Sequence, residues 1–168
     1  MMLAALVDAG VGLEALNEAI GSLGVDARIV AAEVKKKGIR ALKITVEHPP
    51  QTGHRHLHHI RVMIEQSGLT DRQKQTALKI FTRLAEAEAK VHATTVEKVH
   101  FHEVGAVDSI VDICGVAIGL DLLGVDRLVA APVPVGSGWV QTAHGRLPVP
   151  APATVELLCG IPLADSTV

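Results

Sequence analysis

A long amphipathic segment lies near the middle of the chain. Between Thr70 and Val91 apolar side chains recur every three or four positions and charged ones occupy the opposite face, a spacing typical of an α-helix. Thr70 and Gln73 also have the spacing of a capping box, in which two side chains satisfy the free N–H groups at a helix start. We predict a helix from Thr70 to about Val91 with one buried face: Leu78, Phe81, Leu84 and Ala85.

Other segments also show helical periods. Residues 3–24 predict two short helices joined at Gly10-Val11-Gly12, where glycine suits the end of a helix. Residues 109–123 are apolar on nearly every side, which predicts a helix buried on more than one face and ended by Gly124. Two shorter helices are predicted, one ending near Gly68 with Leu57, Ile60 and Ile64 on one face, and one at 154–158.

Two neighbouring segments are rich in β-branched residues. Arg28 to Val34 and Arg40 to Glu47 are separated by Lys35-Lys36-Lys37-Gly38, which predicts a hairpin with a polar turn. Leu128 to Val135 also predicts a strand, although its prolines are tolerated only at a sheet edge or a bulge. Strands that alternate with helices predict a layered α/β domain with a mixed sheet, and the early hairpin leaves an α+β fold open. We expect residues 1–168 to form a single domain with a histidine-rich loop at 48–59.

Composition excludes several classes of function. Only 2% of the residues are aromatic and the formal net charge is −2, so the chain lacks the base-stacking side chains and positive field of a nucleic-acid-binding protein. Its longest apolar stretch, Ile110 to Leu123, is too short and too often interrupted by Gly and Asp to span a bilayer. Two distant cysteines and an N-terminus without positive residues favour a cytoplasmic protein without a disulfide framework or signal peptide.

The histidines are unevenly distributed. Of 9 histidines, several fall within residues 53–59 (GHRHLHH) and two more within residues 100–103 (HFHE). Imidazole is the commonest protein ligand for borderline transition metals. In the first cluster His54 and His56 either form a flexible metal-collecting loop or are incidental histidines of an exposed loop. The adjacent pair His58-His59 is the weaker candidate, because the following helix is expected to include it.

Carboxylates accompany the second histidine cluster. If this segment is extended, His100 and His102 point to one side of the strand and could grip one metal ion, whereas Glu103 points away unless the strand ends there. A pair of structural histidines is the alternative. Asp108 lies near the start of the next helix, where it either joins the metal site or caps the helix. Asp112 lies inside that apolar helix, where it either is costly to bury or looks out through a polar gap.

A glycine-rich segment towards the C-terminus could let the backbone approach a ligand. This segment, VGSGWVQTAHG, includes Gly136, Ser137, Gly138 and His144 and combines small residues with polar side chains. It matches neither the P-loop nor the dinucleotide-binding fingerprint. A phosphate- or nucleotide-binding loop and an ordinary tight turn both fit its composition.

Two long runs of the sequence are RLAEAEAKVHATTVEKVHFHEVGAVDSIVDICGVAIGLDLLGVD and PVPVGSGWVQTAHGRLPVPAPATVELLCGIP. Both closely resemble the LarC nickel insertion family. Within them HFHEVGAVDSIVDI and AHGRLPVPAPAT carry the most specific part of the likeness, and the histidine-rich insertion before RHL is also typical of the family. The resemblance covers essentially the whole chain.

The resemblance implies a nickel chelatase, or nickel insertase, of the lyase class. That family inserts nickel(II) into pyridinium-3,5-bisthiocarboxylic acid mononucleotide with formation of Ni–S and Ni–C bonds, which completes the nickel-pincer nucleotide cofactor of lactate racemase. Apo lactate racemase is an implied partner, and CTP with magnesium or manganese is implied for the complete protein. The implied nickel ligands are His54, His56, His100 and His102, with Glu103 or Asp108. The implied neighbours of the mononucleotide are Gly136, Ser137, Gly138 and His144.

Measured against the family, the chain is expected to be an incomplete N-terminal domain. Family members begin with a strand and a loop that ends in Gly-Asp-Met, and this sequence starts near that Met. The family's C-terminal region, associated with CTP and with homo-oligomers, lies beyond Val168. The fragment alone could therefore lack activity. A nickel storage or delivery module without catalysis, and a structural remnant with incidental histidines, are the alternatives.

Overall fold

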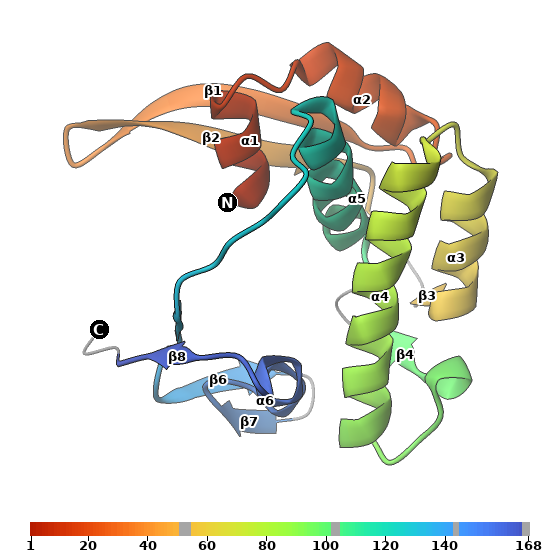
Figure 1. Cartoon of the computed structure of the whole chain (residues 1–168), viewed down its shortest axis with the longest axis vertical. Coiled ribbons are helices and arrows are strands. Elements are labelled where there is room, and N and C mark those ends of the chain that lie inside the picture. The colour runs from red at the N-terminus through yellow and green to blue at the C-terminus, as the bar shows by residue number, and fades with distance from the viewer. Residues whose placement is uncertain (51–54, 102–104, 143–144, 166–168) are drawn as a thin grey trace.

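The computed structural model describes residues 1–50, 55–101, 105–142 and 145–165 (Figure 1). Its helices are α1 (Met2–Asp8), α2 (Leu13–Gly21), α3 (Leu57–Gln66), α4 (Asp71–Val91), α5 (Val107–Leu122) and α6 (Pro152–Leu158), with one 3-10 turn at Val96–Lys98. Its strands are β1 (Arg28–Lys36), β2 (Ile39–Glu47), β3 (Arg55–His56), β4 (His100–Phe101), β5 (Val133–Pro134), β6 (Trp139–Thr142), β7 (Gly145–Pro148) and β8 (Leu163–Ala164).

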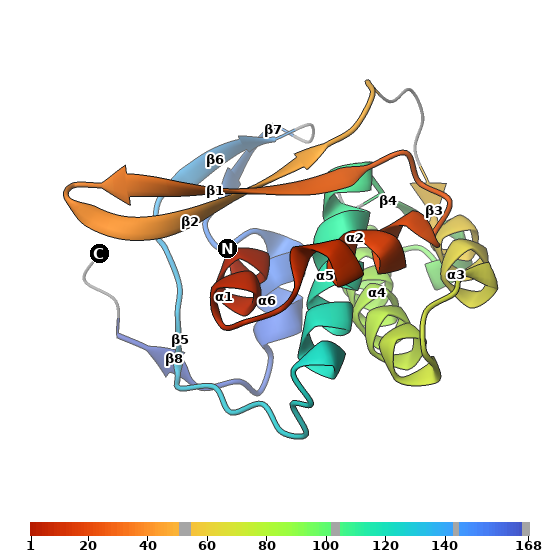
Figure 2. The ribbon, with the colours of Figure 1, turned by 90° about the horizontal axis from the view of Figure 1, so that it is seen from above.

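Helix α5 lies at the centre of the core, where α1, α2 and α4 all pack on it (Figure 2). Small residues allow the close approach of α1: a Cβ atom at Gly115 would lie 2.7 Å from a methyl carbon of Leu3, and one at Gly119 would lie 2.9 Å from Leu6. The prediction of a helix buried on several sides is confirmed. Its fully buried residues include Val107, Ile110, Val111, Cys114 and Ile118.

The long helix α4 and its capping box are also confirmed. The Thr70 hydroxyl accepts a hydrogen bond from the backbone N–H of Gln73 at 3.2 Å, and the Gln73 side chain accepts one from the Thr70 N–H at 3.0 Å. Both side chains also donate to Asp121 near the end of α5, which ties the start of α4 to the core. Phe81 and Ala85 are fully buried, whereas Leu78 and Leu84 are half-buried against the core.

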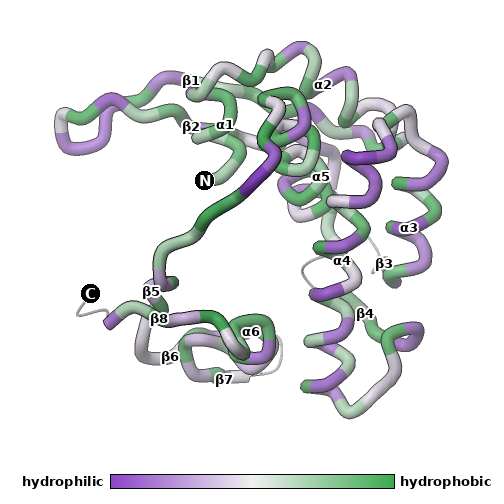
Figure 3. Tube along the Cα trace, viewed as in Figure 1, coloured by the Kyte–Doolittle hydropathy of each residue, from purple (hydrophilic) through white to green (hydrophobic). Residues whose placement is uncertain are grey.

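The predicted hairpin is present, with a shorter turn than expected. Strands β1 and β2 pair antiparallel over their whole lengths, so Lys35 and Lys36 belong to a strand rather than to the connection. The turn consists of Lys37 and Gly38, whose φ angles are 49° and 84°. Two consecutive residues with positive φ form the turn that matches the twist of paired strands. The polar end of the hairpin projects beyond the helices (Figures 1 and 3).

The C-terminal part of the chain packs against α4 through α6, where Lys90 Nζ lies 2.6 Å from Glu156 Oε2. The prediction of a strand over residues 128–135 is wrong except at Val133–Pro134, which pairs parallel with β8. Proline has no backbone N–H to donate to a neighbouring strand, and Leu128 and Val129 are exposed.

The mixed helix and strand content fits a layered α/β or α+β fold, as predicted. The described strands form four two-stranded sheets, of which β5–β8 is parallel and the other three are antiparallel. Within the described ranges no helix is long and apolar enough to cross a membrane.

Candidate functional site

The two histidine clusters meet in space through a short antiparallel ladder. In strands β3 and β4 the Cα of Arg55 pairs with that of Phe101, and that of His56 pairs with that of His100. These strands lie beside the ends of α3 and α4 (Figure 1). His54, His102 and Glu103 lie outside the described residues, and for His100 the structure describes the backbone. The pairing therefore brings together one residue from each cluster, a convergence that sequence spacing did not reveal.

The surroundings of His56 favour a metal-binding form of its ring. Its Nδ1 lies 3.1 Å from the backbone carbonyl oxygen of Val99, to which it donates in the tautomer that carries hydrogen on Nδ1. The neutral ring then carries its lone pair on Nε2. Metal-binding histidines commonly donate their second ring nitrogen to a carbonyl or carboxylate in this way, which fixes the tautomer and the ring orientation. Val99 is thus a supporting residue that the sequence patterns did not indicate.

His58 and His59 lie on α3, as predicted, and His59 has a structural role. Its Nδ1 accepts a hydrogen bond from the backbone N–H of His56 at 3.3 Å, in the first turn of the helix. The rings of His56 and His59 meet edge to face, with centroids 5.5 Å apart. His56 and His59 cap the start of α3 together, because the side chain of each accepts from the backbone N–H of the other, and His58 is exposed.

Buried aromatic packing anchors β4. Phe101 is 2% exposed and its ring lies 6.5 Å from that of Phe81 on α4, while Val99 is also buried. The predicted extended conformation is confirmed for His100 and Phe101. The buried side chains of Val99 and Phe101, which flank His100 in the sequence, therefore hold β4 against the core.

The carboxylates Asp108 and Asp112 lie on the first turns of α5. The helix begins at Val107, so Asp108 is inside its first turn, where its Oδ1 accepts from the backbone N–H of Ser109 at 2.8 Å. The N-cap residue is Ala106, without a side-chain cap hydrogen bond, so Asp108 is not the cap residue; it bonds one free N–H of the first turn, and its metal role stays a proposal. Asp112 is exposed rather than enclosed. Partial burial nevertheless raises its pKa, the N-terminal amine opposes that shift and Asp108 adds to it.

The glycine-rich segment forms a turn in another part of the molecule. The Gly138 carbonyl accepts from the Val149 N–H at 3.0 Å with Gly138 at a φ of 97°, and a Cβ at Gly136 would lie 3.2 Å from a Val149 methyl. Ser137 is exposed, and His144 lies outside the described residues. Figures 1 and 2 both place the β6–β7 hairpin apart from β3 and β4. The predicted mononucleotide segment and the histidine ladder are thus separate features.

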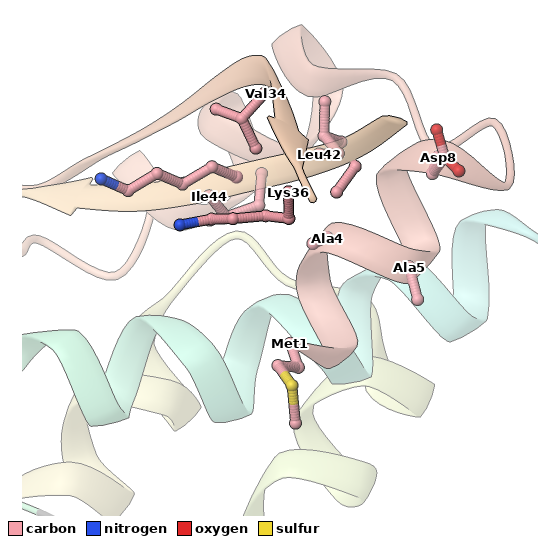
Figure 4. Close-up of a pocket in the computed structure, with 10 residues that line it drawn as sticks. Met1, Ala4, Ala5, Asp8, Val34, Lys36, Leu42 and Ile44 are labelled. Carbon is pink, nitrogen blue, oxygen red and sulfur yellow. The ribbon is translucent and has the colours of Figure 1, made fainter. Parts of the chain in front are cut away.

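A groove beside α1 contains no histidine. It has a volume of about 480 Å³ and lies between α1 and the β1–β2 hairpin, with mostly apolar lining residues such as Ala4, Leu42 and Ile44 (Figure 4). Among the described residues, no group of three or more His, Cys, Asp or Glu side chains is arranged to hold a metal ion. The β3–β4 ladder is therefore the strongest candidate site that the structure offers.

Comparison with known proteins agrees with the sequence resemblance. A family model described as nickel insertion protein matches residues 1–168. The chain is 49% identical over 165 residues to a relative from Rhodopirellula baltica and 54% identical over 166 residues to one from Citrifermentans bemidjiense. Both relatives carry the name "Putative nickel insertion protein". A relative from Desulfitobacterium hafniense (strain DSM 10664 / DCB-2), 49% identical over 164 residues, is named pyridinium-3,5-bisthiocarboxylic acid mononucleotide nickel insertion protein.

These alignments cover 97% of this chain and 41–43% of each relative, so the chain spans less than half the length of the proteins it matches. No solved structure matches it. The family model nevertheless extends over the whole sequence, including both histidine segments and the glycine-rich segment. The chain therefore belongs to the nickel insertion protein family.

Proposed function

We propose that this chain acts in the insertion of nickel(II) into a pyridinium mononucleotide, and that His56 and His100, here called the β3–β4 histidine pair, hold the incoming ion. The observation that carries this proposal is their direct cross-strand pairing. Cβ atoms of direct cross-strand partners are about 5 Å apart, a separation that suits two imidazoles binding one ion. Nickel is the cargo of the reaction rather than a resident cofactor.

A site built on two imidazoles suits the transfer of nickel. Imidazole binds nickel(II) well, whereas soft thiolates compete for it strongly. An ion held by imidazoles and oxygen ligands can therefore pass to the sulfur atoms of the substrate. The other ligands are proposed from the neighbouring sequence: His54, His102, and Glu103 or Asp108.

The proposed substrate is the mononucleotide for which the Desulfitobacterium relative is named. Insertion would form Ni–S bonds to its two thiocarboxylates and a Ni–C bond to the pyridinium ring, with loss of the ring proton at that carbon. The product would serve as the nickel-pincer nucleotide of lactate racemase. We assign CTP consumption, with magnesium or manganese, to the full-length protein. Gly136, Ser137, Gly138 and His144 are proposed neighbours of the mononucleotide.

Nickel titration by calorimetry tests the metal site. The 168-residue chain is compared with His56→Ala/His100→Ala and with the control His48→Ala/His92→Ala, which removes two imidazoles from outside the ladder. Loss of a stoichiometric nickel site in the first variant alone would support the proposal. Equal binding in all three proteins would place nickel elsewhere, and absence of stoichiometric binding in the unaltered chain would contradict a metal site altogether.

A nickel delivery module without catalysis is the second candidate, because the cross-strand pairing of His56 with His100 could hold an ion without acting on the substrate. The two functions differ in what happens to bound nickel. Incubation of the nickel-loaded chain with the bisthiocarboxylate mononucleotide, CTP and magnesium, followed by mass spectrometry, distinguishes them. A product that contains nickel indicates insertion. Nickel that stays on the protein, or that reaches only a competing chelator, indicates delivery.

A further inference from the structure

The β3–β4 ladder needs support from outside its own strands. Among the described residues it contains two residue pairs, Arg55 with Phe101 and His56 with His100, and an isolated two-stranded pair is marginally stable in water. The burial of Phe101 fixes one end of β4. Gly105, just before the start of α5, also lies beside the ladder.

The guanidinium of Arg55 binds the backbone of Gly105. Its Nη1 donates to the Gly105 carbonyl oxygen at 3.1 Å, across 50 positions of sequence. The backbone of the same residue pairs with Phe101 in the ladder. Arg55 therefore grips the chain on both sides of residues 102–104, and the bond from its cationic donor is stronger than one between neutral groups.

Gly105 fits against the ladder only because it lacks a side chain. A Cβ atom there would lie 3.0 Å from the Phe101 carbonyl oxygen, 3.1 Å from the Phe101 Cβ and 3.2 Å from the Arg55 backbone nitrogen. Two of these three neighbours are backbone atoms, which cannot turn aside as the end of a flexible side chain would. A side chain at this position would therefore push Phe101 and Arg55 away from their present positions, because of this close approach and not because of an unusual backbone angle.

We propose that Arg55 and Gly105 are positioning residues of the nickel site, a clasp that holds β4 in register with β3 and so fixes the geometry of the β3–β4 histidine pair. This inference rests on the proposed nickel function. The clasp is adjacent to both members of the pair: Arg55 precedes His56 in the chain, and its ladder partner Phe101 follows His100. Neither clasp residue needs to contact the ion, because loss of a group that orients a metal ligand typically lowers metal affinity by about 10- to 100-fold.

The test uses two independent changes on the whole chain, with a matched control for each. Arg55→Met keeps the aliphatic stem and removes the donor, and Gly105→Ala introduces the crowded Cβ. The controls are Arg61→Met, on the exposed face of α3, and Gly21→Ala, where a Cβ would meet nothing within 4 Å. Arg55→Lys restores one cationic donor. Nickel affinity, the visible absorption bands of bound Co²⁺ and the metal-free Tm are measured for each.

Both clasp variants should bind nickel about 10- to 100-fold more weakly than the unaltered chain and should shift the Co²⁺ bands, while the controls change neither. Arg55→Lys should recover part of the affinity. Unaltered affinity and bands in folded Arg55→Met or Gly105→Ala would overturn the clasp while the nickel function stands. Equal nickel binding by the unaltered chain and His56→Ala/His100→Ala would instead remove the proposed function, and the inference with it.

Discussion

Nδ1 of His56 lies 3.1 Å from the Val99 carbonyl oxygen, across 43 positions of sequence. In the tautomer that donates from Nδ1, this bond and the proposed metal bond use different nitrogens of the ring. In His56→Asn the amide nitrogen replaces Nδ1 and keeps the bond to Val99. In His56→Gln the longer side chain places its polar group nearer the position of Nε2.

We expect His56→Asn to lose nickel affinity while its stability stays within about 0.5 kcal/mol of that of the unaltered chain. His56→Gln should lose about 1 kcal/mol of unfolding free energy, the net contribution of one hydrogen bond. Urea denaturation and nickel titration on both variants check this. Full nickel affinity in a folded His56→Asn variant would show that Nε2 is not a ligand.

The start of α4 provides a test of the fold alone. Thr70→Ala removes the hydroxyl that caps the helix and donates to Asp121, so we expect a loss of about 1–2 kcal/mol in the free energy of unfolding. Thr76→Ala is the matched control, since Thr76 lies inside α4 and its hydroxyl bonds only within the helix, to the Arg72 carbonyl. Urea denaturation with far-UV circular dichroism compares the two. Equal losses of unfolding free energy in the two variants would mean that Thr70 at the cap stabilises the chain no more than Thr76 inside the helix does.

The raised pKa of Asp112 predicts a pH dependence of stability. Burial raises this pKa above its ordinary value of 3.8, so between the two values the folded chain binds more protons than the unfolded chain. The stabilising contribution of the protonated carboxyl is full below 3.8 and is lost as the pH rises through the folded pKa. Asp112→Asn should therefore gain stability relative to the unaltered chain as the pH is raised.

Urea denaturation from about pH 3 to about pH 7, which spans the titration of a carboxyl with a modestly raised pKa, measures this difference. Asp26→Asn, at an exposed position before β1, serves as the control. A difference between Asp112→Asn and the unaltered chain that stays constant across this range would contradict the expected linkage.

The two cysteines should differ sharply in reactivity. Cys114 is buried in α5, and burial raises the pKa of its thiol to about 12, whereas Cys159 is exposed. Because the thiolate is the reactive form, we expect a disulfide reagent such as dithionitrobenzoate to modify Cys159 in the native chain and Cys114 only on unfolding. Cys159→Ser should leave no rapidly reacting thiol. Rapid reaction of that variant under native conditions would indicate that α5 opens readily.

Local patterns were sufficient to predict the helices. The capping box and the apolar period of α4, the all-round apolar character of α5 and the β-branched segments around Lys37-Gly38 are properties of neighbouring residues, and the structure confirms each. Of the strand predicted at residues 128–135, the structure has Val133–Pro134, and the exposed Leu128 and Val129 before it find no place in a sheet.

The candidate site depends on distant pairs, which sequence spacing cannot reveal. Both histidine clusters were visible as candidate metal sites, but their meeting requires β3 to pair with β4 across the whole of α3 and α4. The sequence did not reveal the groups that support His56 and the ladder either, because they also act through contacts between distant residues. One is a backbone carbonyl at Val99, and the other is a glycine whose importance lies in the proximity of Arg55 and Phe101.

The ladder between β3 and β4 closes a loop that contains all of α3 and α4. An ion held by His56 and His100 would act as a reversible cross-link across that loop. Loading would then restrict the motion of the two helices, and transfer of the ion to the substrate would release the restriction. Nickel binding would thus change the amide hydrogen exchange rates of α3 and α4, including residues distant from the ion.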